Sequence, residues 1–261
     1  MHLFRLVVVL SLLLVSIRAA DDPLAGYAPG YVTLVRNAIR SFVQRDFETT
    51  LSLIDQADQI VPATPMALNI RGAVAIEQKQ FDVGRKYCID ALRTDPKFYP
   101  ARFNLAEIPF VQGKYAEARA LLERMLEDHP KDDLLMFRIY LTYLLEKDET
   151  AAKEHLDQIP FLSNTPVYYF AQGAWEFAHG NEKEGRAWIE RGHYVFPPHK
   201  SQNFIEVFFD LGWLKRGSEA GTVAAEAAPA PFSDPGTAPT PLAPTPPAAP
   251  PEPAPTAPPA E

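Results

Sequence analysis

Cysteine is nearly absent from this chain, because Cys88 is the only one among 261 residues. A single thiol excludes an intramolecular disulfide, even in an oxidising compartment. Since Cys88 lies among apolar neighbours, we expect a buried, inert thiol and not a nucleophile. No cysteine lies near the N-terminus to accept a lipid, which argues against a lipoprotein.

Positive charge is also scarce. The chain has 25 Lys and Arg residues against 33 Asp and Glu, for a net charge of -8, and its basic residues form no cluster. Binding to a phosphate backbone requires a basic patch or stripe. We therefore predict no nucleic-acid partner.

The residue patterns of catalytic and metal sites are missing as well. The chain has no HExxH pair, no phosphate-binding glycine loop and no G-x-S-x-G turn. We accordingly predict no enzymatic activity, no cofactor and no metal site. The histidines after the first residues are scattered, at His129, His155, His179, His193 and His199.

Long hydrophobic runs are limited to the N-terminus, where Arg5 precedes the apolar run 6–15. A membrane-spanning helix needs about 20 apolar residues, so this run is typical of a secretory signal peptide. We predict a leader over residues 1–19, cleaved after Ala19, no membrane span in the mature chain, and a periplasmic or secreted location. The alternative is an uncleaved leader that tethers the protein to the membrane.

A 34-residue period is the main positive feature of the sequence. Prolines recur at Pro62, Pro96 and Pro130, and an aromatic residue stands 15 positions ahead of each, at Phe47, Phe81 and Tyr115. A fixed period of this length predicts stacked helical hairpins and an extended surface, not one closed pocket.

Small and apolar residues fill the remaining positions of the repeat. In the second unit these are Leu68, Gly72, Ala75, Gly84, Cys88 and Ala91, and in the third they are Leu105, Ala106, Ala118, Leu122 and Met125. The pattern resembles the tetratricopeptide repeat. The resemblance implies an all-α fold, a right-handed α-solenoid of about five hairpins.

The repeat phase places a solenoid over 31–216, followed by a Pro-rich tail that we expect to be disordered, over 217–261. The fourth unit departs from the pattern at Glu149 and Asn164, and Pro160 should cut its second helix short. The expected units are 31–64, 65–98, 99–132, 133–165 and 166–199, with a capping helix over 201–216 that begins at Ser201.

The first helix of each hairpin is expected to line a concave groove for a peptide or helix. The alternative is that the same residues only pack the repeats together. The predicted groove residues are Val35, Ile39, Phe42, Asn69, Ile76, Phe103, Glu107, Phe110, Phe137, Leu141, Phe170 and Phe177.

The capping helix carries a second candidate surface. Phe209 and Trp213 fall opposite its apolar stripe and could join two copies in a homodimer; alternatively, they fill the end of the groove. The tail, with 14 prolines after residue 217, favours a polyproline-II tether, which could bind an aromatic-lined groove or act as a spacer. The alternative is a tail that only keeps the protein soluble.

Taken with the resemblance, these features predict a non-catalytic scaffold or adaptor that binds a peptide or helix of unknown identity in a bacterial cell envelope. Two alternatives are a structural subunit that self-associates through the terminal helix and a membrane-tethered scaffold that keeps its leader.

Overall fold

A computed structural model describes residues 23–215 of the chain. The predicted signal peptide and Pro-rich tail lie outside the described residues. The described part forms eleven helices and contains no strand, so the all-α prediction is confirmed.

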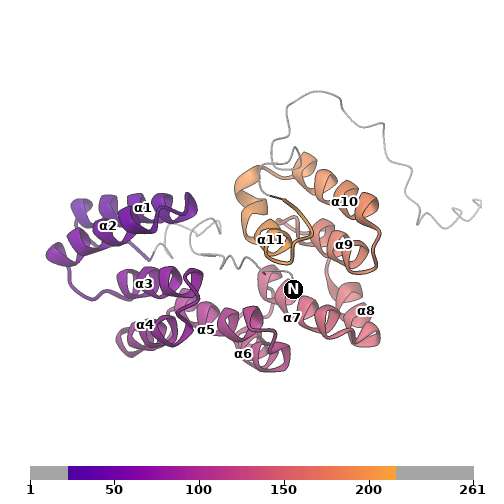
Figure 1. The fold of residues 1–261 in the computed structure, drawn as a ribbon, viewed down its shortest axis with the longest axis horizontal. Coiled ribbons are helices and arrows are strands. Elements are labelled where there is room, and N and C mark those ends of the chain that lie inside the picture. Colours follow the sequence, from indigo (N-terminus) through magenta and orange to yellow (C-terminus); the bar gives the residue numbers. More distant parts are fainter. Residues whose placement is uncertain (1–22, 216–261) are drawn as a thin grey trace, which may run out of the picture. The chain divides into compact units, whose positions relative to one another are not determined.

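The helices follow one another as hairpins (Figure 1). The first helices of successive hairpins also contact each other; examples are α3 with α5 and α7 with α9. This order is that of an α-solenoid, as predicted. The pairs are α1 (Pro29–Val43) with α2 (Phe47–Ile60), α3 (Pro65–Glu77) with α4 (Phe81–Thr94), α5 (Tyr99–Val111) with α6 (Tyr115–Asp128), α7 (Asp133–Glu146) with α8 (Glu149–Gln158), and α9 (Val167–Ala178) with α10 (Glu182–Val195); α11 (Pro198–Asp210) follows.

The turn inside each hairpin contains one residue with a left-handed backbone. Glycine takes this position in only two of the five turns. In the other three, a residue with a side chain adopts a conformation that only glycine adopts without steric cost. The residues and their φ angles are Arg45 at 63°, Lys79 at 61°, Gly113 at 74°, Lys147 at 62° and Gly180 at 80°.

Close packing of α3 on α4 depends on glycine. A Cβ atom placed on Gly84 would lie 2.5 Å from Cγ1 of Ile76, and one on Gly72 would lie 3.3 Å from the carbonyl oxygen of Gly84. Any larger residue at Gly84 would force the helices apart. Cys88 lies in the same contact and is buried, as the sequence predicts.

The fourth hairpin shows the effect of its irregular sequence. Helix α8 ends at Gln158, before Pro160, and has only 10 residues. The loop that follows leaves Phe161 and Leu162 exposed, at 58% and 90%. Thr165 fastens this loop to α7 by donating a hydrogen bond to the carboxylate of Asp133.

The C-terminal helix begins earlier than predicted. It starts at Pro198 and not at Ser201, because proline suits the first position of a helix, where no backbone N–H is needed. Ser201 therefore lies inside the helix, where its side chain is buried, and the prediction that it caps the helix is wrong.

Candidate interaction site on the inner face of the repeats

Helix α11 lies on the first helices of the last two hairpins, α7 and α9. We call the corresponding side of all five first helices, which carries the predicted groove residues, the inner face. Phe204 of α11 places its ring 5.5 Å from that of Phe137 in α7 and 5.9 Å from that of Phe170 in α9. One turn later, Phe208 contacts Phe170 at 5.8 Å and Phe177 at 5.7 Å. The inner face at α7 and α9 thus holds a helix through aromatic residues spaced four apart.

Several predicted groove residues pack inside their own hairpins. The ring of Phe42 lies 5.6 Å from that of Phe47, and the ring of Phe110 lies at the same distance from that of Tyr115. Each contact joins the end of a first helix to the opening aromatic of the second. The alternative interpretation, packing between helices, describes these residues.

Ile76 and Phe177 occupy the equivalent position in their repeats and lie against glycines of the second helix, Gly84 and Gly185. Val35 and Leu141 are fully buried in the hydrophobic core. Of the twelve predicted groove residues, only Ile39 is not buried. The expected exposed apolar strip is therefore absent from these positions, because the side chains pack against neighbouring elements; a role in binding stays a prediction.

The remaining positions of the predicted groove include a buried polar group. Asn104 donates a hydrogen bond from Nδ2 to Oδ1 of Asn69, at 3.0 Å, which joins α5 to α3. Glu107 forms an ion pair with Arg138 of α7 at 3.3 Å. We call Asn69, Asn104, Glu107, Arg138 and Asp210 the inner-face cluster.

Arg138 is the centre of this cluster. Its side chain is 1% exposed, and its guanidinium lies 5.2 Å from the ring centre of Phe110 and 6.0 Å from that of Phe103. Sequence reasoning missed Arg138, although it is the only charged residue in the apolar run 134–145. A lone charge inside such a run is the signal that could have identified it.

The cluster contains an excess of acid. Burial raises the pKa of Asp210 to about 9; nearby Arg138 opposes this shift, and the carboxylates of Glu77, Glu206 and Glu107 add to it. Burial also raises the pKa of Glu107, against the effect of Arg138. Asp210 is therefore mostly protonated at neutral pH.

Hydrogen bonding within the cluster is incomplete. Among the described residues, no hydrogen-bond partner is present for Nε of Arg138, Oε1 of Glu107 or Oδ1 of Asp210. A buried polar atom without a partner costs about 1–3 kcal/mol. Groups held at such a cost mark a candidate functional site.

The predicted self-association residues lie beside this face. The ring of Trp213 stacks on that of Phe177 at 5.8 Å and 7° between planes, and Phe209 is half-buried against the same core. Trp213 therefore packs at the end of the groove, as the alternative interpretation expects; self-association through Phe209 and Trp213 stays a prediction.

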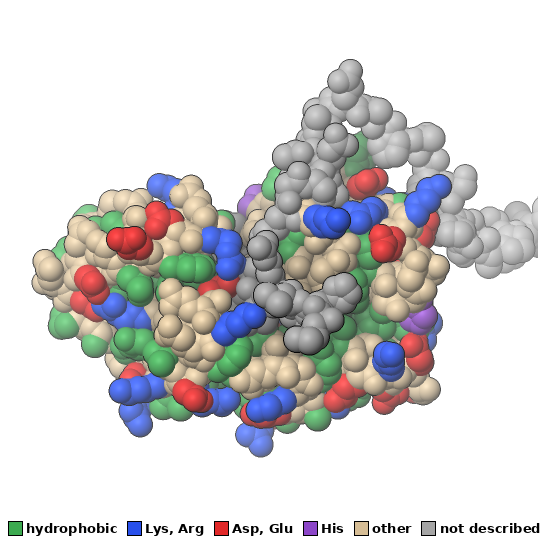
Figure 2. All heavy atoms as spheres, in the orientation of Figure 1, with side chains coloured by type: hydrophobic (Ala, Val, Ile, Leu, Met, Phe, Trp, Pro, Cys, Tyr) green, Lys and Arg blue, Asp and Glu red, His purple; other side chains and the backbone are tan. Residues whose placement is uncertain are grey.

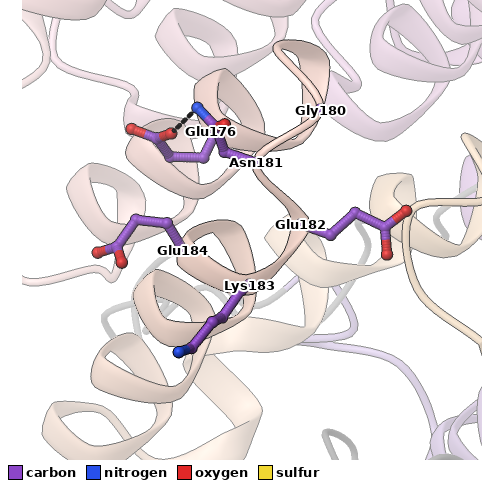
Figure 3. Close-up of a pocket in the computed structure, with 6 residues that line it drawn as sticks. All are labelled: Glu176, Gly180, Asn181, Glu182, Lys183 and Glu184. Atoms are coloured by element: carbon purple, nitrogen blue, oxygen red, sulfur yellow. Dashed lines mark hydrogen bonds between the residues drawn. The ribbon is translucent and has the colours of Figure 1, made fainter.

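A surface hollow of about 640 Å³ lies at the turn between α9 and α10 (Figure 3). Asn181 donates a hydrogen bond to Glu176 across it, at 2.8 Å, while Glu182 and Glu184 point in different directions. Because the carboxylates do not converge, the hollow has no acid–base pair for catalysis.

Other classes of site find no support within residues 23–215. No group of three His, Cys, Asp or Glu side chains there could hold a metal ion, and none of the helices in that range has the length and apolarity needed to cross a membrane. Basic and acidic side chains are interspersed on the face that Figure 2 shows.

Comparison with known proteins agrees with this geometry. Residues 75–138 match the model of the tetratricopeptide repeat family. A tetratricopeptide repeat protein of Parabacteroides merdae is similar in structure, with a TM-score of 0.55, 15% identity and coverage of 71% of this chain and 73% of that one.

Two further solved structures share the fold. A thermophilic repeat protein of Thermus thermophilus has a TM-score of 0.54 at 16% identity, over 69% of this chain and 98% of its own. The Pseudomonas aeruginosa protein pilF has a TM-score of 0.50 at 16% identity, over 70% and 86%. No curated protein matches the chain.

Tetratricopeptide repeats are helical hairpins that serve as scaffolds for protein–protein interaction. The helical hairpins, their 34-residue period and the family match lead to one conclusion: residues 75–138 are tetratricopeptide repeats, and the described part of the chain has the fold of a tetratricopeptide repeat protein.

Proposed function

We propose that this protein is a non-catalytic scaffold or adaptor that binds a peptide or helix of a partner protein on its inner face, in a bacterial cell envelope. One observation carries the proposal: the inner face at α7 and α9 is already built to hold a helix, α11, through Phe204 and Phe208.

The same contacts specify the kind of segment that fits. Two apolar anchors four residues apart lie on one face of a helix, and grooves of this type recognise amphipathic helices by such anchors. We therefore expect a partner helix with aromatic or aliphatic residues at that spacing.

Crosslinking tests the binding surface. A photoreactive phenylalanine at Ile39, half-buried on α1, should capture a partner from an extract of the source organism. The same residue at Val83, which is 44% exposed on α4, is the matched control and should capture none. Capture from Val83 alone, or equally from both positions in folded proteins, would contradict the proposal.

The location rests on the leader-like residues 1–19 and has its own test. These residues, fused to an alkaline phosphatase that is active only after export, should give activity in intact cells. A fusion that begins at residue 23 should give none, and activity from neither fusion would contradict export. Intact Met1 in the membrane fraction would support the tethered alternative.

A further inference from the structure

The last repeat carries a cluster of aromatic rings apart from the inner face. Five rings, those of Phe161, Tyr168, Tyr169, Trp188 and Phe196, form one connected group that we call the aromatic surface. Centroid distances are 5.0 Å for Phe161 and Tyr168, 6.0 Å for Tyr168 and Trp188, and 6.2 Å for Tyr169 and Phe196. These three pairs meet edge to face, which leaves ridges between the rings.

One ring of this surface, Phe161, is exposed, and the other four are half-buried, whereas the core aromatics are buried. Phe161 is 58% exposed, and its neighbour Leu162 is 90% exposed. Tyr194 and Val195, which precede Phe196, are 71% and 53% exposed. The other large exposed apolar residues of the described part, such as Val83 and Ile89, lie on α1, α2 and α4, away from this repeat. A group of exposed apolar residues of this kind marks an interaction site.

Two cations contact the rings. The guanidinium of Arg191 lies 4.6 Å from the ring centre of Trp188, and Arg191 also pairs with Glu184 at 3.2 Å. The ammonium of Lys200 lies 5.9 Å from the ring centre of Phe196 and donates a hydrogen bond to the carbonyl of Asn164 at 2.6 Å. The surface therefore suits an apolar chain that carries a little negative charge.

Proline-rich chain has this chemistry. A polyproline-II segment is already extended, so it loses little conformational entropy on binding. Its proline rings fit between aromatic side chains. The protein itself contains a proline-rich sequence: residues 241–259 hold ten prolines and one acid, Glu252, and lack Lys and Arg. The charge of this segment complements that of Arg191 and Lys200.

We propose that the aromatic surface binds proline-rich chain, and that its occupant is the segment 241–259 of a second copy of this protein. Two copies that exchange these segments make two contacts per pair, which raises the overall affinity without any new type of contact. The surface and its occupant are separate from the inner face and from the partner proposed for it.

Fluorescence anisotropy tests the contact with a labelled peptide of residues 241–259 and the full-length protein. We expect saturable binding that weakens at least about tenfold with Phe161→Ser, the loss expected of a central anchor. Val83→Ser, an exposed residue of α4, is the matched control and should bind as the unchanged protein does. A peptide with Pro250, Pro251 and Pro253 replaced by Ala should also bind at least about tenfold more weakly.

Equal binding by the two protein variants, or undiminished binding of the alanine peptide, would overturn the proposal. An oligothymidylate that competes fully for the same surface would also overturn it, in favour of stacked bases. Sedimentation tests the second copy: the full chain should dimerise with rising concentration, and the chain without residues 229–259 should not. A full chain that stays monomeric while the peptide binds would overturn the assignment to a second copy.

Discussion

At the scale of one residue, Asp210 is a carboxyl group whose position in the fold lowers the stability of the protein. Its carboxyl is drawn into the inner-face cluster by its position at the end of α11, next to Arg138 but also near three other acids. Asp210 is half-buried, but its Oδ1 atom is buried without a hydrogen-bond partner, which is costly when the carboxyl is ionised. Removing it should therefore stabilise the protein.

Replacing Asp210 by Asn should raise the melting temperature at pH 8, by roughly 2–4 °C for each kcal/mol gained in a protein of this size. The folded pKa of about 9 lies above the value near 3.9 of an unfolded chain, so the acid costs increasing stability as the pH rises between them. The gain should shrink toward pH 5, which scanning calorimetry at several pH values would measure.

A matched control is Asp128, whose pKa is lowered by its hydrogen bond from Arg102. Asp128→Asn removes a favourable interaction and should not stabilise the protein at any pH. A destabilising effect of Asp210→Asn at pH 8 would show that the carboxylate is ionised and well paired in the folded protein.

At the scale of the element, turns and helix ends decide where each hairpin folds. The sequence predicted that Phe47, Phe81 and Tyr115 open the second helices of the first three hairpins, and they are the first residues of α2, α4 and α6. The structure adds that Asp46 and Asp148 cap α2 and α8. The sequence did not predict that Arg45, Lys79 and Lys147 adopt positive φ, since the turn takes its shape from the packing of the two helices and not from these residues.

Lys147→Gly should raise the free energy of unfolding by about 0.5–1 kcal/mol, because it removes a steric cost of roughly 1–2 kcal/mol and adds a smaller entropic cost of glycine. Lys147 has a φ of 62° at the end of α7, and glycine adopts this conformation without the steric cost of a Cβ atom. Urea unfolding would measure the change. Lys147→Ala removes the same charge and keeps the Cβ atom, so this control should gain nothing; an equal gain would assign the effect to charge.

The hairpins α7–α8 and α9–α10 are also joined by a titratable pair. Nδ1 of His179, at the end of α9, lies 2.7 Å from the carbonyl oxygen of Trp175, and Nε2 lies 3.0 Å from Glu149 at the start of α8. The bond to the Trp175 carbonyl is the main cause that raises the pKa of His179, with Glu149 adding to it against the effect of burial.

Nuclear magnetic resonance titration should accordingly find the pKa of His179 above its usual value near 6.5. The stabilisation is complete below that value and is lost as the pH rises through the folded pKa. Glu149→Gln should lower the pKa. His155, whose pKa burial lowers, is the internal control with the opposite sign. An unchanged His179 pKa in Glu149→Gln would remove Glu149 from the pair.

At the scale of the whole molecule, the 34-residue period was sufficient to predict the fold, because each hairpin repeats the same local contacts. The inner face was not predictable in the same way. Phe42, Phe110 and Phe177 occupy the same position of the repeat, yet Phe42 and Phe110 contact the opening aromatic of their own hairpin, whereas Phe177 contacts Phe208 of α11. The repeat period predicts where a residue lies along its helix. Which neighbouring helix then covers its side chain depends on the tertiary packing.

Repeat packing also divides the main core into two large clusters. One extends from Leu24 to Ile108 and contains Cys88; the other, from Phe103 to Leu214, is larger and includes α11. Because stability in a solenoid comes from each repeat and its neighbours, we expect the smaller cluster to open first. Burial raises the pKa of the Cys88 thiol to about 12, so Cys88 should react with a thiol reagent only after this opening.

The chain provides a separate probe for each cluster. Its three tryptophans, Trp175, Trp188 and Trp213, all lie at α9 or later, so their fluorescence reports the larger cluster. In a urea titration, Cys88 should become reactive at a lower concentration than the midpoint of the fluorescence change. A control variant with Cys88→Ala and Ala152→Cys places the thiol in the larger cluster, where its reactivity should follow the fluorescence. Coincident midpoints for Cys88 and the tryptophans would instead show that the two clusters unfold together, and that the contacts of α5, which contributes Ile108 to one cluster and Phe103 to the other, couple them into one cooperative unit.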